Sequence, residues 1–301
     1  MAKSPLKLGY SVYDLSNPAF QEWEAGVRAG AEEGGAELIV ADQKSSEATQ
    51  VSGSADLINQ GISGLIVTPV QPAALPQTID LAHQNQIPVV IGDIGVAGSY
   101  DAYVVSDSVE AGRQAANYII EQLTSSSEPP YEVAIIELHA GSVVGEDRDA
   151  GFEEVMAANG DFTIVASVDG NDTVEGGYTA AKDILAANPD VKAIFGTNGG
   201  TALGASRAVL ESGRSIGQDG VVIIGIDGTQ QELDAIADGT LSATIGQDFY
   251  GLGRLAALTA LQLLEGDSPA WDDIDAKTIL FPTQVVTADN LEAYLEAKNN
   301  R

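Results

Sequence analysis

The heptapeptide VVIIGID, from Val221 to Asp227, is an apolar, β-branched run that ends in an acid and passes into the turn-forming pair Gly228-Thr229. An apolar run bounded by turn residues is typical of a β-strand. The same pattern occurs just before it at Ala193–Asn198. It occurs twice more in the first half of the chain, at Gly64–Pro69 and Pro88–Asp93. The two halves echo each other, which predicts two similar lobes rather than one long sheet.

Outward from these segments, apolar runs alternate along the chain with amphipathic stretches of about ten to fifteen residues. Repeated strand–helix units predict a parallel sheet covered by helices. Strands are predicted at Leu8–Val12, Leu38–Ala41, Gly64–Val67, Val89–Gly92, Tyr103–Val105, Val133–Leu138, Ile164–Val168, Ala193–Gly196, Val221–Ile226 and Ala243–Ile245. Helices are predicted at Ala19–Gly34, Val51–Gln60, Ala73–Gln84, Gly151–Ala158, Gly177–Ala187, Ala202–Ser212 and Tyr250–Leu264. A polar break at Ser125–Pro130 precedes the second set, so two doubly wound α/β lobes are expected.

The composition limits the classes of function. The 301 residues include 44 acids against 14 Lys and Arg, which gives a formal net charge of −30 at pH 7. Nucleic-acid phosphates would repel such a chain, so no nucleic acid is predicted as a partner. The chain has no cysteine, and its two histidines, His83 and His139, are far apart in sequence. Disulfides and thiolate chemistry are excluded, and no metal site and no cofactor is predicted.

Two interpretations of the acidic composition stay open at this point. One is an ordinary solvated surface. The other is adaptation to high salt, in which counterions screen the repulsion between carboxylates. No apolar run approaches the roughly 20 residues that span a bilayer, so no direct membrane insertion is predicted. Met1 to Leu8 lack the apolar core of a secretory signal, so an exported form is expected to have lost its signal.

Polar side chains follow most of the predicted strands. In open α/β sheets, ligands bind outside the carboxyl ends of the strands, so these side chains are candidate ligand contacts. They combine carboxylates, amides and one guanidinium, which bond hydroxyl groups well, with rings that cover apolar C–H faces. A small sugar or polyol is therefore the predicted ligand. The candidates are Tyr13, Asp14, Asn17, Phe20, Thr68, Asp93, His139, Arg148, Asp172, Asn198, Asp227 and Gln247.

Each candidate also has a structural alternative. Asp, Asn, Ser and Thr after strands are common helix N-caps and turn residues. Asn17 precedes Pro18, the arrangement of an N-cap followed by a first-turn proline. Arg148 lies among Glu146, Asp147 and Asp149, which would suit a surface ion pair. His139 has the alternative of an ordinary packed or solvated histidine.

At these residues the chain resembles the periplasmic sugar-binding proteins of the ribose- and galactose-binding type. The resemblance covers about Lys7 to Thr287 and rests on several segments in order. They are Ser16-Asn17-Pro18-Ala19-Phe20, Pro88-Val89-Val90-Ile91-Gly92-Asp93, Arg148-Asp149-Ala150-Gly151-Phe152, Thr197-Asn198 with Ala202-Leu203-Gly204-Ala205, Gly225-Ile226-Asp227-Gly228-Thr229 and Ala243-Thr244-Ile245-Gly246-Gln247. Three positions depart from the pattern. Ile94 stands where an arginine is common, Asp172 aligns with a stacking aromatic, and Ala19 replaces a second aromatic.

The resemblance implies the type I periplasmic binding protein fold, with a ligand clamped between lobes joined by a three-strand hinge. It implies an N-terminal lobe of residues 1–106 plus 248–281 and a C-terminal lobe of residues 107–247 plus 282–301. The implied hinge lies near Ser106-Asp107, Gln247-Asp248 and Phe281-Pro282. The implied function is that of a monomeric receptor for an ABC importer, in the periplasm or otherwise outside the cytoplasm. The implied partner is the membrane permease of that transporter.

Other classes of function find less support. The ligand-binding core of a sugar-responsive regulator shares this fold, but such proteins carry a DNA-binding segment before the first strand. Ile226-Asp227-Gly228-Thr229 is superficially similar to a phosphoryl-transfer motif, yet Gly225 occupies the position of the nucleophile. No nucleophile elbow or P-loop is present, so no enzyme is predicted. A chemosensory receptor that presents its bound ligand remains an alternative to transport.

Overall fold

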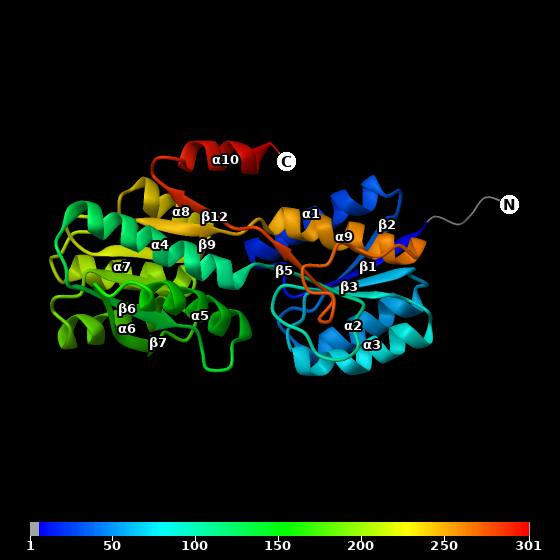
Figure 1. Ribbon diagram of the computed structural model, residues 1–301. Helices are drawn as coiled ribbons and strands as arrows, with labels where there is room; N and C mark the ends of the chain where they lie inside the picture. Colours follow the sequence, from blue (N-terminus) through cyan, green and yellow to red (C-terminus); the bar gives the residue numbers. More distant parts are fainter. Residues whose placement is uncertain (1–5, 301) are drawn as a thin grey trace. The chain divides into compact units, whose positions relative to one another are not determined.

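The computed structural model describes residues 6–300, which divide into two compact units (Figure 1). The first unit contains the chain up to Ser106 and Asp248–Pro282, and the second contains Asp107–Gln247 and the chain from Thr283. Pro282 therefore groups with the first unit, because it directly follows a strand of that unit's sheet. Met1 and Arg301, the outer limits of the predicted lobes, lie outside the described residues. Within residues 6–300, no helix has both the length and the apolar character needed to cross a membrane.

The first unit is built on a six-stranded sheet in which every pairing is parallel. The strand order is β11-β5-β4-β3-β1-β2. The strands are β1 (Lys7–Val12), β2 (Glu37–Asp42), β3 (Gly64–Val67), β4 (Val89–Gly92), β5 (Ala102–Ser106) and β11 (Thr278–Phe281). The central strands β3 and β4 are buried along their whole length, which their continuous apolar sequence requires.

Helices cover both faces of this sheet. One apolar core joins the sheet to α1 (Pro18–Glu33) and α9 (Phe249–Glu265), with Trp23 fully buried in it. A second core, on the other face, joins it to α2 (Glu47–Asn59) and α3 (Leu75–Gln84), which follows a short 3₁₀ turn at Pro72–Ala74. Every loop that follows β1, β2, β3 or β4 therefore emerges at one edge of the sheet, where the predicted ligand residues lie.

The second unit repeats this plan with the strand order β12-β10-β9-β8-β6-β7. Its strands are β6 (Tyr131–Glu137), β7 (Phe162–Asp169), β8 (Ala193–Gly196), β9 (Val222–Asp227), β10 (Ala243–Gly246) and β12 (Gln284–Thr287). All pairings are parallel except that of β12, which runs antiparallel to β10 at the sheet edge. The predicted parallel sheet is therefore confirmed for every pairing of the named strands except that of β12 with β10. Pro282 and Thr283 alone separate β11 from β12, so the chain enters the second sheet directly from the first.

Helices again pack on both faces. On one face lie α4 (Ser108–Ser126) and α5 (Val143–Ala157), and on the other lie α6 (Val174–Ala187) and α7 (Gly199–Glu211). The shorter α8 (Gln230–Ala237) and α10 (Leu291–Asn299) pack together through Leu233, Val286 and Tyr294. The sequence pattern missed α4 because its buried face is made largely of small residues, such as Ala111, Ala115 and Ala116.

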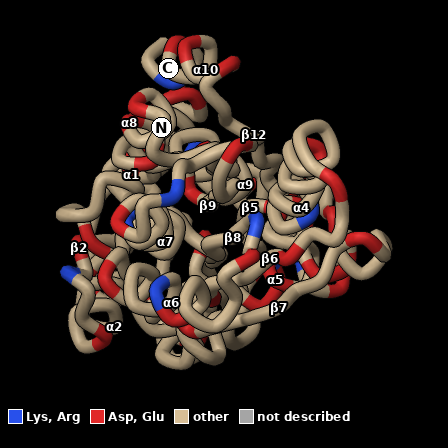
Figure 2. The backbone as a smooth tube through the Cα atoms, turned by 90° about the vertical axis from the view of Figure 1, so that its left-hand side faces the viewer, with Lys and Arg blue, Asp and Glu red and all other residues tan. Residues whose placement is uncertain are grey.

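Acidic residues are spread over both units rather than gathered in one segment. Figure 2 shows Asp and Glu on many helices and loops, with Lys and Arg at few positions. Exposed acids such as Asp56, Asp80 and Asp183 stand on the outer faces of α2, α3 and α6. Much of the net charge therefore faces solvent, where added salt can screen it.

Candidate ligand-binding site

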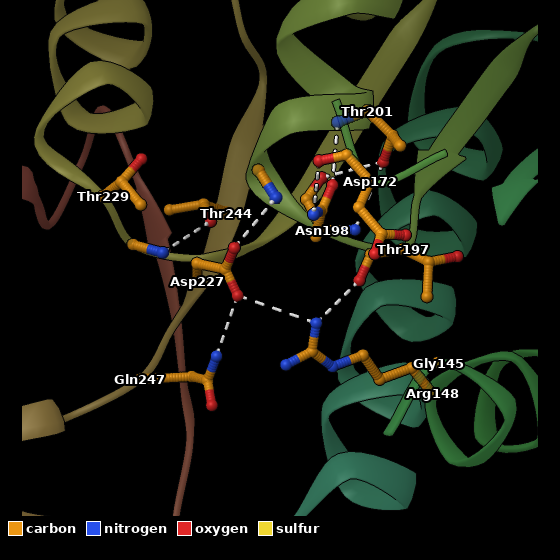
Figure 3. A network of polar contacts seen from close by, with 12 residues as sticks. Gly145, Arg148, Asp172, Thr197, Asn198, Thr201, Asp227, Thr229, Thr244 and Gln247 are labelled. Carbon is orange, nitrogen blue, oxygen red and sulfur yellow. Dashed lines mark hydrogen bonds and ion pairs between the residues drawn. The ribbon is translucent and has the colours of Figure 1, made fainter. Parts of the chain in front are cut away.

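Three of the predicted side chains in the second unit point toward one another (Figure 3). Arg148 comes from α5, Asp227 ends β9, and Gln247 follows β10. Gln247 Nε2 donates to Asp227 Oδ1 at 2.9 Å, and Arg148 Nη1 lies 3.6 Å from the same oxygen. A carboxylate, an amide and a guanidinium thus meet beyond the ends of neighbouring strands, where the sequence predicted a ligand.

Arg148 is 6% exposed, which overturns the alternative of a surface ion pair. Its Nη1 also donates to the carbonyl oxygen of Thr197 at 2.9 Å. The helix that carries Arg148 lies against α4 so closely that a Cβ on Gly112 would be 1.9 Å from the Arg148 carbonyl oxygen. Glycine at position 112 therefore sets the position of the arginine backbone.

The Nε atom of Arg148 is buried, and it has no hydrogen-bond partner within the described part of the chain. A buried donor left without an acceptor costs about 1–3 kcal/mol. A ligand oxygen that reached this donor would remove that cost. The unsatisfied donor makes Arg148 a candidate contact for an oxygen atom of a ligand.

Asp227 adopts an unusual backbone conformation, with a φ of 142°. Its Oδ2 accepts from the backbone N–H of Gly199 at 3.3 Å, at the start of α7. Burial raises the pKa of Asp227, and the guanidinium of Arg148 opposes that rise. Strained residues often lie at functional sites, and here the strain turns a carboxylate toward an arginine.

Asn198 and Asp172 lie beside this group (Figure 3). Asn198 is the N-cap of α7, because its Oδ1 accepts from the N–H of Thr201 at 2.8 Å. Its Nδ2 donates to the carbonyl oxygen of Asp172 at 3.2 Å. The structural alternative for Asn198 is therefore correct, although capping engages only part of the amide.

His139 and Asp172 contact each other. Asp172 Oδ1 accepts from the backbone N–H of His139 at 2.8 Å, and Oδ2 lies 2.5 Å from His139 Nδ1. Both side chains are well exposed. The sequence predicted each as a ligand contact, but it did not predict that the two side chains contact each other.

In the first unit, the loop after β1 presents an aromatic pair. The rings of Tyr13 and Phe20 stack with centroids 4.9 Å apart. Asn17 caps α1 by accepting from the N–H of Ala19 at 3.0 Å, as its structural alternative proposed. Asp14 accepts hydrogen bonds from Ser16 and Ser45, and these bonds lower its pKa. The carboxylate of Asp14 is thus bound both by its own loop and by the loop that follows β2.

Thr68 and Asp93 follow β3 and β4. Thr68 is fully buried, and its hydroxyl lies 3.0 Å from the N–H of Tyr13 and 3.1 Å from the hydroxyl of Tyr10. It therefore holds the Tyr13 loop in place. Asp93 has a φ of 65°, and its carbonyl oxygen accepts from the hydroxyl of Tyr103 at 2.6 Å. This bond helps to fix the backbone that carries the Asp93 carboxylate.

Sequence reasoning missed two buried polar residues that support these loops. Gln43 is fully buried after β2, where its Nε2 donates to Ser11 and to the carbonyl oxygen of Thr68, while its Oε1 accepts from the N–H of Val70. Glu232 is fully buried on α8. Thr229 and Glu232 have the spacing of a capping box, a sequence signal that could have identified the glutamate. Within residues 6–300, no group of three acidic or His side chains is arranged to hold a metal.

Comparison with known proteins identifies the family. A model described as periplasmic binding protein domain matches residues 8–268. The ribose import binding protein of Bacillus subtilis is 31% identical over 265 residues, which cover 88% of this chain and 83% of that protein. A periplasmic ribose ABC transporter structure from Conexibacter woesei superposes with a TM-score of 0.88 at 25% identity, covering 97% of this chain and 95% of that one.

A third relative is the periplasmic binding protein component of an arabinose ABC transporter from a Shewanella species, solved with α- and β-L-arabinofuranose. It superposes with a TM-score of 0.81 at 26% identity, covering 98% of this chain and 96% of that one. The extent of these matches confirms the predicted fold and the resemblance. This chain belongs to the periplasmic binding protein family and is a sugar-binding member of the ribose- and galactose-binding type.

Proposed function

We propose that this protein is the substrate-binding receptor of an ABC importer and captures a neutral monosaccharide or polyol. The observation that carries the proposal is the group formed by Arg148, Asp227 and Gln247. It brings together a buried guanidinium with an unsatisfied Nε, a carboxylate and an amide. These are the donors and acceptors that hydroxyl groups need, because each hydroxyl both donates and accepts.

The family supports a binding role without turnover. The relatives described above are binding proteins or components of transporters for ribose and arabinose. We infer that the chain is not an enzyme and that its partner is a membrane permease. We also infer that it works in the periplasm or another compartment outside the cytoplasm.

The first unit has its own set of side chains suited to a sugar. The stacked rings of Tyr13 and Phe20 offer an apolar surface of the kind that covers sugar C–H groups. Asp93, held by its backbone bonds, offers a further carboxylate. We propose that these three residues contact the ligand directly, whereas Thr68 supports Tyr13 and Asn17 begins α1.

A binding screen tests the proposal. The panel contains D-ribose, D-allose, L-arabinose and xylitol, and the readout is the melting temperature with and without each compound. A ligand that binds only the folded state raises stability by about 2.7 kcal/mol at a hundredfold excess over Kd. We expect at least one compound to raise the melting temperature, with binding verified by calorimetry. D227A should abolish the rise. No shift with any monosaccharide or polyol would contradict the proposal, and so would chemical conversion of a bound compound.

A further inference from the structure

Glu232 is a fully buried carboxylate that the proposed ligand contacts do not include. Three donors converge on it. Its Oε1 accepts from the hydroxyl of Thr244 at 2.6 Å. Its Oε2 accepts from both the N–H and the hydroxyl of Thr229, each at 2.8 Å. A buried carboxylate that accepts three hydrogen bonds holds the donor residues, and the backbone that carries them, in place.

The backbone that it fixes is the turn directly after Asp227. The hydroxyl of Thr244 bonds Glu232 and also accepts from the N–H of Gly228 at 3.3 Å. The two residues that follow Asp227 are therefore both tied to Glu232, one through Thr244 and one directly. Figure 3 shows Thr229, Thr244 and Asp227 around this turn.

This tether matters because Asp227 itself is strained. An L-residue rarely adopts a φ of 142°, and such strain persists only where the surroundings impose it. Glu232 also lies against the start of α7, since a Cβ on Gly199 would be 2.4 Å from Glu232 Oε2. Gly199 supplies the N–H that Asp227 Oδ2 accepts. Glu232 is thus bonded to the turn that follows Asp227 and also packs against the glycine whose N–H bonds the Asp227 carboxylate.

We propose that Glu232 is the positioning residue of the site, holding the turn after Asp227 so that its carboxylate faces Arg148. This inference rests on the proposed function, because it assigns Asp227 to the ligand. Glu232 itself is fully buried, and its polar contacts are with Thr229 and Thr244. Its effect on affinity must therefore pass through Asp227.

The chain offers a graded set of variants. E232A removes all three hydrogen bonds. T244V removes the hydroxyl that bonds Gly228 and keeps the volume of the side chain. E232Q keeps the shape, since its amide oxygen can accept from Thr229 while its NH₂ group donates to Thr244. D234A is the matched control, because Asp234 is an exposed acid on the same helix, bonded to Gln230.

Calorimetric Kd values for the tightest-binding member of the four-compound panel provide the first test. We expect E232A and T244V to weaken binding about tenfold, E232Q to stay within about threefold of the parent, and D234A to have no effect. In a D227N background, E232A should change Kd by less than about twofold, because the contact that it positions is already lost. Parent-like binding by E232A would overturn the proposal. An equal loss in both backgrounds would also overturn it, since a general destabilisation would be additive.

A measurement without ligand separates this inference from the proposed function. Amide hydrogen exchange should accelerate at Gly228 and Thr229 in E232A and remain slow in E232Q and D234A. If no sugar binds but exchange responds in this way, the proposed function fails while the tether stands. Unchanged exchange at both amides in E232A would refute the tether whatever the sugar result.

Discussion

The Nη1 atom of Arg148 lies 3.6 Å from Oδ1 of Asp227, which is beyond a normal hydrogen bond and within the range of an ion pair. The two groups therefore attract each other while the guanidinium keeps its Nε free of any partner among the described residues. A pair held at this separation can accept a hydroxyl group without first breaking a hydrogen bond. The binding free energy then loses little to reorganisation.

Replacing Arg148 by alanine should weaken sugar binding by about 1–3 kcal/mol or more, because it leaves the Asp227 carboxylate without its cation. R148K should recover only part of the loss, since an ammonium lacks the planar fork. The measurement is calorimetric titration, with circular dichroism to verify folding. R207A is the control, because Arg207 is an exposed arginine on α7, paired with Glu211. Unchanged binding by R148A would remove Arg148 from the site.

Three other replacements test the rest of the set. D93A, N198A and Q247A should each weaken binding by about 1–3 kcal/mol, because a buried hydroxyl loses its partner. N198A should in addition lower stability by about 1 kcal/mol, since it removes the N-cap of α7. Normal binding by N198A together with lower stability would show that capping is its only role.

The pH dependence of stability follows from Glu232. Burial raises the pKa of Glu232 to about 7, and the charge on Asp227 adds to the rise. A raised pKa means that the folded state binds the proton more tightly than the unfolded state. The stability that Glu232 contributes is therefore fully present below its unfolded pKa, near 4.5, and is lost as the pH rises through about 7.

E232Q should remove this loss, which amounts to about 1–3 kcal/mol between pH 5 and pH 8. Urea unfolding at several pH values measures it, with D234N as the control for removing an exposed acid from the same helix. The free energy of unfolding of E232Q should fall less steeply with pH than that of the parent. Parallel slopes for the two proteins would show that Glu232 does not titrate in this range.

The site was predictable from the sequence where local pattern and strand order coincide. Asp227 ends β9 and Gln247 directly follows β10, and because these parallel strands are paired the sheet itself brings the two residues together. His139 and Asp172 illustrate what the sequence could not give. They are 33 positions apart, and their contact depends on the loops after β6 and β7. Glu232 was missed for a different reason. Its capping-box spacing with Thr229 indicates the start of a helix, but a glutamate in a helix is usually solvated and the spacing does not indicate burial.

In the fold, too, some elements were predictable from local sequence and others were not. Buried strands such as Val89–Gly92 and Ala193–Gly196 were predicted to the residue, because continuous apolar runs have few alternatives. The edge strands β11 and β12 were not, since their partly exposed sequences carry weak patterns. Their pairing depends on neighbours that are distant in sequence. The antiparallel direction of β12 follows only from the path of the chain.

Stability should also respond to salt. With a net charge of −30 and many exposed acids, repulsion between carboxylates opposes folding, and NaCl screens it. The melting temperature should rise between 0.1 M and 2 M NaCl. A triple variant D56N/D80N/D183N removes three exposed charges and should show a smaller rise. A melting temperature that stays flat or falls would remove the interpretation of salt adaptation and leave an ordinary acidic surface.

The charge of the ligand is the last prediction. In the second unit, the carboxylate of Asp227 lies beside the guanidinium of Arg148, and the charge on Asp172 raises the pKa of Asp227 further. Ile94, an uncharged residue, follows Asp93 in the first unit, at a position where the resemblance to the ribose- and galactose-binding type would imply an arginine. A phosphate or carboxylate on the ligand would meet carboxylates in a partly desolvated setting, at a cost of several kcal/mol for an unpaired contact. Neutral hydroxyls have no such cost, because each carboxylate accepts from them.

Calorimetric titration of D-ribose, D-ribose 5-phosphate and D-ribonic acid, or the matched series for whichever sugar binds, should therefore give measurable affinity for the neutral member alone. Tighter binding of either anion would show that Asp172 stays with His139 and away from the ligand, and that Arg148 serves the anion rather than Asp227.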